Sequence, residues 1–276
     1  MRLSKRSVCL SISLGAIILL VLCEIFRFSS LFEVEEGSIL AISLDMMITR
    51  FLGGVAFLAM LVNLEYKVLN PIRKPFLRSV LFALPAFLIA INNFPFSAVI
   101  CGMARLTESG GMVLLLFLEC MMVGFFEETA FRGVVFLGIL RKNPQSRLWA
   151  FASVAISSAV FGLVRLVNLF TSSPVAVIMQ IGYSALIGAM CAVVLLKSAN
   201  IWLCVVIHGL YNFCGAVIPR LGDGEIWDAF TIVLTVIVSL LVAAYMIAAF
   251  VKGKMPLIND IYGINQTEPS DKNKTT

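Results

Sequence analysis

The chain has 276 residues, of which 60% are hydrophobic and only 13% are charged, and its mean hydropathy is +1.00. A soluble domain carries about 25% charged residues, so this chain has too little polar surface to fold in water. Its net charge of +5 would suggest nucleic acid as a partner of a soluble protein. Here the basic residues lie in short connections between apolar blocks and indicate membrane orientation, so we expect no nucleic-acid partner.

The apolar residues form continuous blocks of about 18 to 25 residues, the length of a helix that crosses a hydrocarbon core of about 30 Å. Because the blocks do not alternate, and because spanning segments must satisfy their own backbone polar groups, helices are favoured over a barrel. The predicted fold class is all-α, a polytopic transmembrane helix bundle of about eight helices. In chain order the expected helices are Val8–Cys23, Leu40–Leu64, Arg78–Ile91, Gly111–Leu140, Leu148–Val167, Pro174–Leu196, Ile201–Ile218 and Asp228–Val251.

Two of these helices have ends that the sequence specifies. Met1–Arg6, followed by an apolar run, is typical of a signal peptide, but Val21–Cys23 lacks the small residues of a cleavage site, so we expect a retained first helix. The third helix is short. It should end at Asn92–Pro95, because proline disfavours helical geometry in the residue before it.

Charged residues alternate between two sets of connections. The first set is basic and holds Arg2, Lys5, Arg6, Lys67, Arg73, Lys74, Arg78, Arg141, Lys142, Arg147, Lys197, Lys252 and Lys254. The second set holds Glu33, Glu35, Glu36, Arg105, Glu108, Arg220, Asp223, Glu225 and Asp228. Basic connections stay in the cytoplasm, so we expect a multi-pass protein of the cell membrane with both termini cytoplasmic.

We expect three regions along the chain: N-terminal transmembrane helices (1–105), a membrane core that carries the motifs below (106–255), and a polar, disordered cytoplasmic tail (256–276). The seven cysteines lie in or beside apolar blocks, and no C-x-x-C occurs. An odd number without paired spacing predicts neither a disulfide scaffold nor a zinc–thiolate site.

The fourth block carries two adjacent carboxylates and an arginine, although a charge near the middle of a membrane helix costs about 3 kcal/mol or more. Glu128 and Arg132 are four residues apart and can pair on one face. Glu127 is turned by about 100° from Glu128, so we expect it to point elsewhere and to be free to act as a general base or acid. The alternative is a structural ion pair that holds two helices together.

Two further pairs have the same four-residue spacing. His208, which is the only histidine, shares a helix face with Asn212. Imidazole can move protons or bind metal, and an amide can donate to an oxyanion, but interhelical hydrogen bonding is an equally open interpretation. Phe161 and Arg165 form the other pair, in which Arg165 either extends toward the headgroups or faces the bundle.

Taken in order, the motifs are Glu127-Glu128-x-x-x-Arg132, Phe161-x-x-x-Arg165 and His208-x-x-x-Asn212. Over roughly Gly110 to Pro219 they resemble the CAAX-protease and bacteriocin-processing (ABI) family of intramembrane endopeptidases. The resemblance implies membrane helices around a conical, cytosol-accessible cavity. It also implies hydrolysis of a peptide bond in a peptide or in the tail of a membrane-associated protein.

Carried over residue by residue, the resemblance implies that Glu127 is the general base that activates water. Glu128 and Arg132 would support and orient it. His208 and Asn212 would stabilise the tetrahedral intermediate.

In the second motif, Phe161 would line the site, but Arg165 replaces the histidine that the family carries. Arginine has no acceptor and cannot coordinate a metal, so we expect no bound divalent metal and no other cofactor. We hypothesise that Arg165 pairs with Glu127 and closes the water site. A cation there favours the charged form of Glu127 and makes it a poorer base.

Three functions follow from these expectations. The first is an active membrane endopeptidase. The second is a pseudoprotease that acts by binding, as a regulator or a bacteriocin immunity factor, and Arg165 is the residue that favours it. The third, a transporter or channel, has less support because we find neither an inverted repeat nor paired broken helices. The oligomeric state is left open.

Overall fold

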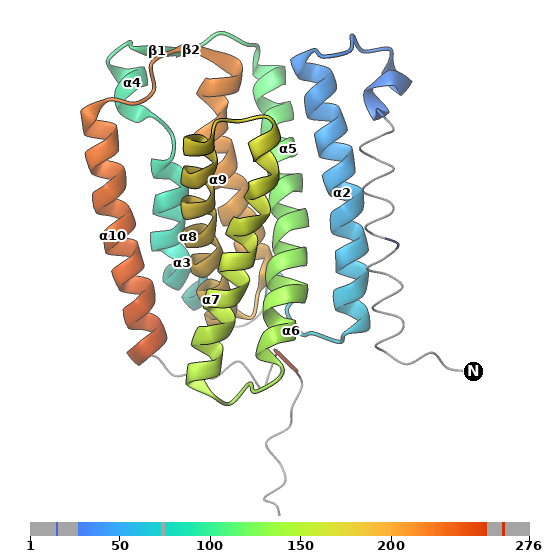
Figure 1. Cartoon of the computed structure of the whole chain (residues 1–276), viewed down its shortest axis with the longest axis vertical. Coiled ribbons are helices and arrows are strands. Elements are labelled where there is room, and N and C mark those ends of the chain that lie inside the picture. The colour runs from blue at the N-terminus through green and yellow to red at the C-terminus, as the bar shows by residue number, and fades with distance from the viewer. Residues whose placement is uncertain (1–14, 16–26, 73–74, 253–260, 263–276) are drawn as a thin grey trace, which may run out of the picture.

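The computed structural model describes residues 15, 27–72, 75–252 and 261–262, which form a helix bundle (Figure 1). The elements of its first part are η1 (Phe28–Phe32), α2 (Ile39–Asn63), α3 (Phe76–Asn92), α4 (Phe96–Ile100) and β1 (Ala104–Leu106). The elements that follow are α5 (Gly110–Glu128), η2 (Thr129–Phe136), α6 (Leu137–Leu140), α7 (Arg147–Leu163), η3 (Val164–Phe170), α8 (Pro174–Ser198), α9 (Ile201–Leu221), β2 (Gly222–Gly224) and α10 (Ala229–Lys252).

The predicted all-α membrane bundle is confirmed. Six helical segments of the described chain are long and apolar enough to cross a membrane, and α3 is a shorter apolar helix of 17 residues. It ends at Asn92, as predicted. The expected helix Val8–Cys23 lies almost entirely outside the described residues, so the count of eight stays a prediction.

Polar caps define where four of the long helices begin. The side-chain oxygens of Ser38, Ser109, Ser146 and Ser173 accept hydrogen bonds from backbone amides in the first turns of α2, α5, α7 and α8. Such bonds satisfy amides that have no partner within the helix. Each of these segments therefore starts at a serine that precedes its apolar run.

Three features depart from the expected regular helices. The fourth expected helix is interrupted by the π-helix η2, in which the Thr129 hydroxyl donates to the carbonyl oxygens of Phe125 and Phe126 at 2.7 and 3.0 Å. The fifth expected helix ends as the 3₁₀-helix η3. A two-stranded antiparallel ribbon, in which Ala104 faces Gly224, joins the loops before α5 and after α9.

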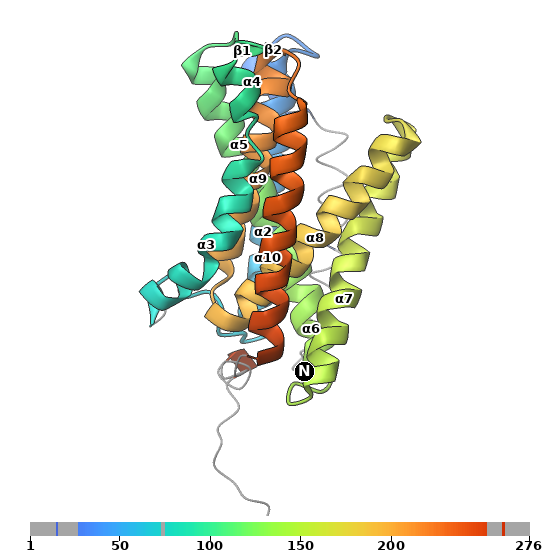
Figure 2. The same ribbon diagram turned by 90° about the vertical axis from the view of Figure 1, so that its left-hand side faces the viewer.

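The bundle has two chemically different ends (Figure 1). The basic end, at the bottom of the figure, holds the described residues Lys67, Arg78, Arg141, Lys142, Arg147, Lys197 and Lys252, together with Glu65. The acidic end, at the top, holds Glu33, Glu35, Glu36, Glu108, Asp223, Glu225 and Asp228, together with Arg27 and Arg105. The hairpin of α7 and α8 leans away from the other helices toward the acidic end (Figure 2).

The largest apolar core fills the half of the bundle nearer the basic end. It joins residues of α2, α3, α6, α7, α8, α9 and α10, and its fully buried members include Leu61, Phe136, Leu140, Leu195 and Ile201. A smaller core near the acidic end packs α4 and β1 against α5 and α9. The charged residues predicted for the site lie between these two cores.

Candidate active site

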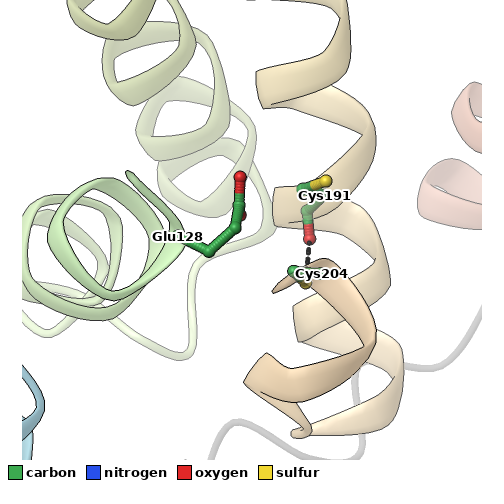
Figure 3. Close-up of side chains that lie close together, drawn as sticks. All are labelled: Glu128, Cys191 and Cys204. Atoms are coloured by element: carbon green, nitrogen blue, oxygen red, sulfur yellow. Dashed lines mark hydrogen bonds between the residues drawn. The ribbon is translucent and has the colours of Figure 1, made fainter. Parts of the chain in front are cut away.

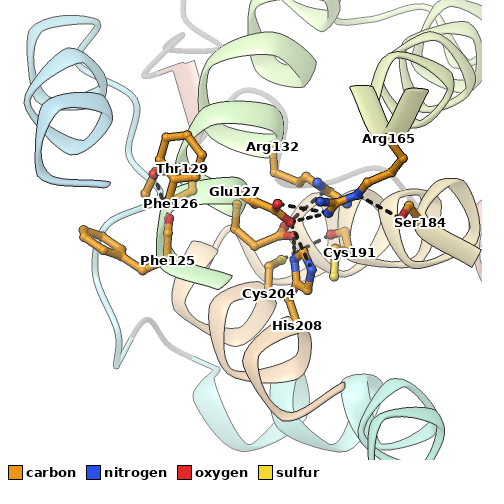
Figure 4. A network of polar contacts seen from close by, with 11 residues as sticks. Phe125, Phe126, Glu127, Thr129, Arg132, Arg165, Ser184, Cys191, Cys204 and His208 are labelled. Carbon is orange, nitrogen blue, oxygen red and sulfur yellow. Dashed lines mark hydrogen bonds and ion pairs between the residues drawn. The ribbon is translucent and has the colours of Figure 1, made fainter. Parts of the chain in front are cut away.

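Glu127 and Arg165 form an ion pair inside the bundle (Figure 4). Arg165 Nη2 donates to both carboxylate oxygens of Glu127, at 2.9 and 2.7 Å, and Arg165 Nε donates to the Ser184 hydroxyl oxygen at 3.2 Å. Arg165 therefore faces the bundle rather than the headgroups. The pairing hypothesised from the sequence is present.

Glu128 lies deeper and has two partners. Its Oε2 lies 3.1 Å from Arg132 Nε, and its Oε1 lies 2.7 Å from His208 Nδ1. The contact with Arg132 is an ion pair without good hydrogen-bond geometry, because Oε2 has no hydrogen-bond partner. The predicted pairing of residues four apart is confirmed, and His208 ties α5 to α9.

Glu127 and Glu128 have different arginine partners, as expected, but both carboxylates also contact His208, which was not predicted. His208 bridges them: its Nε2 lies 3.4 Å from Glu127 Oε2 while its Nδ1 contacts Glu128. A 100° turn separates two directions on an isolated helix, but α9 packs between these directions and receives both carboxylates. Two carboxylates and two guanidinium groups share one buried cluster, and their charges sum to zero.

Phe161 packs against both guanidinium groups. The Cζ atoms of Arg132 and Arg165 lie 4.2 and 5.0 Å from the centre of its ring, and His208 meets the ring edge to face at 5.7 Å. Arg132 Nη1 and Nη2 have no hydrogen-bond partner, so the ring face offers them their nearest favourable contact. Phe161 therefore holds both arginines in place.

A polar cavity of about 220 Å³ adjoins the cluster. It is lined by Val123, Phe161, Arg165, Asn168, Gln180, Tyr183, Ser184, Ile187, His208, Tyr211 and Asn212. Asn212 is half-buried, and no hydrogen bond from its side chain occurs among the described residues. Its amide is therefore available to a bound molecule. Glu127 lies behind Arg165, which covers it from the cavity.

An apolar cavity of about 250 Å³ lies beside the polar one and shares Tyr183, Ile187 and Tyr211 with it. Most of its other lining residues come from α3, α7, α8 and α10. Side chains of α10 such as Ile247 and Val251 are exposed along the wall that faces the lipid. A molecule with a polar and an apolar part could therefore occupy both cavities.

The residues around Glu127 do not fit a divalent metal. Both oxygens of Glu127 already accept from Arg165, and the guanidinium places a positive charge where a cation would lie. Glu128, Cys191 and Cys204 also offer ligand atoms within 4.8 Å of one another (Figure 3). Here too Glu128 is engaged by Arg132 and His208, and Cys204 Sγ contacts the Cys191 carbonyl at 3.2 Å. We assign no metal to either set.

Polar residues that the sequence motifs did not single out also belong to the site. Gln180 and Ser184 lie four residues apart in α8; Ser184 contacts Arg165, and the Asn168 amide donates to Gln180 Oε1 at 2.6 Å. The four-residue spacing that singled out His208 and Asn212 would also have found this pair.

A second buried ion pair, between Glu119 and Arg220 at 2.5 Å, links α5 to α9 nearer the acidic end.

The described helices and their buried charges define a multi-pass membrane protein. Residues 109–214 match the family model described as type II CAAX prenyl endopeptidase Rce1-like. All seven predicted site residues lie within the match, so the part of the chain that carries the site is similar to that family of membrane endopeptidases. No curated protein and no solved structure matches the chain.

Proposed function

We propose that the chain is an intramembrane endopeptidase in which Glu127 activates water for the hydrolysis of a peptide bond. One observation carries the proposal: a buried carboxylate lies 3.4 Å from a histidine nitrogen, beside a polar cavity inside a membrane bundle. A polar cavity of this size can hold water. A positioned carboxylate and imidazole there can act as general base and acid.

The proton arrangement follows from the contacts of His208. Glu128 accepts a hydrogen bond from Nδ1–H, which leaves Nε2 as an acceptor in the neutral imidazole. Nε2 then faces Glu127 Oε2, so these two acceptor atoms can hold between them one proton taken from water. Glu127 and His208 are thus a pair that takes up one proton from water and releases it later.

Hydrolysis would proceed in two steps. Glu127 takes a proton from water while the water oxygen attacks the peptide carbonyl carbon, and the carbonyl oxygen becomes an oxyanion. Asn212 donates its amide hydrogen to that oxyanion, as preorganised donors do in acyl transfer. The proton then passes by way of the Glu127–His208 pair to the leaving nitrogen as the carbon–nitrogen bond breaks, which gives a carboxylic acid and an amine.

Arg165 must release Glu127 before Glu127 can act as a base. The ion pair joins residues whose side chains are 26% and 9% exposed, so it can open toward the polar cavity without disrupting the core. The freed guanidinium can then stabilise the oxyanion together with Asn212. The adjoining apolar cavity would hold an apolar part of the substrate, which suits a peptide or a protein tail at the membrane.

The same ion pair also favours a second function. If Arg165 never releases Glu127, the chain is a pseudoprotease that acts by binding, as a regulator or an immunity factor. The observation that favours this function is that one guanidinium nitrogen of Arg165 donates to both carboxylate oxygens of Glu127, at 2.9 and 2.7 Å.

Cleavage by the purified protein in detergent separates the two functions. A panel of lipid-modified and signal-type peptides is incubated with the wild type, Glu127→Ala and Arg165→His, and with Glu108→Ala as a control at an exposed carboxylate. Activity lost only in Glu127→Ala supports the protease. A silent wild type with an active Arg165→His variant supports the pseudoprotease, and activity that survives Glu127→Ala contradicts the proposed base.

A further inference from the structure

Three residues line both the polar and the apolar cavity, namely Tyr183 and Ile187 of α8 and Tyr211 of α9. The centres of the two tyrosine rings lie 6.2 Å apart, and the ring planes are tilted by 47°. Ile187 is buried, whereas Tyr183 is 43% exposed and Tyr211 is half-buried. The two tyrosines therefore present accessible side chains at the junction of the cavities.

The position of Tyr211 is fixed by a contact between α3 and α9. The Asn93 side-chain amide donates to the Tyr211 carbonyl oxygen at 2.8 Å. Gly215, one turn further along α9, makes room for this amide, because a Cβ atom there would clash with Asn93 Nδ2. The backbone of Tyr211 is thus held by a second helix directly before Asn212.

Tyr183 lies beside the charged pair of the site. It directly precedes Ser184, whose hydroxyl oxygen accepts from Arg165 Nε at 3.2 Å (Figure 4). The electrostatic field of Arg165 and Glu127 reaches the Tyr183 hydroxyl, which in turn influences the hydroxyl of Tyr211. The two phenols therefore lie between the reacting groups and the apolar cavity.

Neither of these phenol hydroxyls makes a hydrogen bond within the part of the chain that the structure describes. The hydroxyl of Tyr245, by contrast, donates to the Phe82 carbonyl oxygen at 3.3 Å. A phenol can both donate and accept a hydrogen bond, and a polar group in apolar surroundings is costly until it finds a partner. Tyr183 and Tyr211 are therefore available to polar atoms of a molecule that extends from one cavity into the other.

We propose that Tyr183 and Tyr211 are substrate-binding residues that hold the peptide backbone where it passes from the polar into the apolar cavity. Their hydroxyls donate to backbone carbonyl oxygens of the peptide, and their rings pack on its apolar groups. A backbone held there, next to Asn212, keeps the bond to be cleaved beside Glu127 and His208. This role rests on the proposed function for its substrate, but binding requires no turnover and is measured separately.

Peptide binding to a variant that lacks the base tests this role. Tyr183→Phe and Tyr211→Phe remove only the hydroxyls and are made singly and together in a Glu127→Gln background, with Tyr245→Phe as the matched control. The probe is a palmitoylated peptide that carries a benzophenone group, and the same peptide without the palmitoyl chain is the comparison. Photo-crosslinking in detergent, in competition with unlabelled peptide, gives the affinity, and thermal unfolding is recorded for each variant.

Loss of one hydrogen bond corresponds to about 3- to 10-fold weaker binding. We expect this loss for the palmitoylated peptide in each single variant, a larger loss in the double variant, and none in Tyr245→Phe. The unfolding temperature should not fall in Tyr183→Phe or Tyr211→Phe, because their hydroxyls make no hydrogen bond in the described structure. The peptide without the chain does not extend into the apolar cavity, so its binding should change less.

Unchanged affinity in the double variant would overturn the proposal, and so would an equal loss in Tyr245→Phe or for the two peptides. Absence of crosslinking to every variant would also overturn it. Binding that depends on the hydroxyls, without cleavage by the wild type, would support this inference and contradict only the proposed protease. Cleavage by the wild type with binding that ignores the hydroxyls would do the reverse.

Discussion

Gly124 of α5 and Gly209 of α9 bring the two helix backbones into direct contact, and a Cβ atom on Gly124 would lie 2.9 Å from the Gly209 amide nitrogen. The same Cβ would lie 2.8 Å from the Val205 carbonyl oxygen. Helices that cross without intervening side chains approach each other closely, as small residues allow in membranes. Glu128 lies one turn after Gly124, and His208 directly precedes Gly209, so this approach places His208 within reach of Glu128.

Gly124→Ala should therefore separate α5 from α9 at the site. We expect a destabilisation of about 1–3 kcal/mol, as for overpacked cores, and loss of whatever cleavage the wild type shows. The measurement is thermal unfolding in detergent alongside peptide cleavage. Gly138→Ala is the matched control, since a Cβ atom there meets nothing within 4 Å. Equal effects of the two substitutions would contradict the close-contact argument.

Arg132→Met should destabilise the protein because it leaves Glu128 charged and buried without its cationic partner. Breaking a buried pair in this way costs about 3–5 kcal/mol. Arg132 is 1% exposed and Glu128 is fully buried, so water cannot compensate. Adding Glu128→Gln should restore most of the lost stability, because the double variant carries no unpaired charge. A double variant that unfolds as early as Arg132→Met would refute this account of the pair.

Asn212→Ala should lower the turnover number and leave stability unchanged. Its amide makes no side-chain hydrogen bond in the described structure, so its removal costs the folded state little. Loss of one oxyanion donor typically lowers turnover by about 10²–10³-fold. Steady-state cleavage and thermal unfolding are measured together, with the exposed Asn143→Ala as control. A large drop in unfolding temperature would instead assign Asn212 a structural role.

Asp228 should make the acidic end sensitive to acid. The Ser97 hydroxyl and the Thr231 backbone amide donate to its carboxylate at 2.5 and 2.7 Å, and these bonds hold the pKa of Asp228 below its ordinary value of 3.8. The folded state therefore binds this proton more weakly than the unfolded state does. The hydrogen-bonded carboxylate stabilises the folded state fully above the ordinary pKa of 3.8, and this stabilisation disappears as the pH falls through the lower pKa of the folded state.

Asp228→Asn removes this dependence. We expect the variant to unfold at a lower temperature than the wild type at neutral pH, and the difference to shrink as the pH falls below 3.8. Thermal unfolding across a pH series in a non-ionic detergent measures it. A difference that stays constant with pH would show that Asp228 contributes through its shape and not through its charge.

Local sequence determined much of this protein. Apolar block length predicts the spanning helices, serines precede the helices that they cap, and the four-residue spacing predicts the pair of Glu128 with Arg132. The motifs also identify the family that residues 109–214 match. The serine caps and the pair of residues four apart depend on neighbours within about one turn of helix. Block length and the order of the motifs can be read directly along the chain, so the sequence alone is enough for them.

Only the tertiary structure decided how the charges are shared. His208 lies 80 residues from Glu128, and Arg165 lies 38 residues from Glu127. From the sequence, Arg165 could either extend toward the headgroups or face the bundle and pair with Glu127. The contact of His208 with both carboxylates was not predicted. Such contacts depend on the distance and angle at which helices cross. Packing at Gly124 and Gly209 sets that crossing, and no local periodicity encodes it.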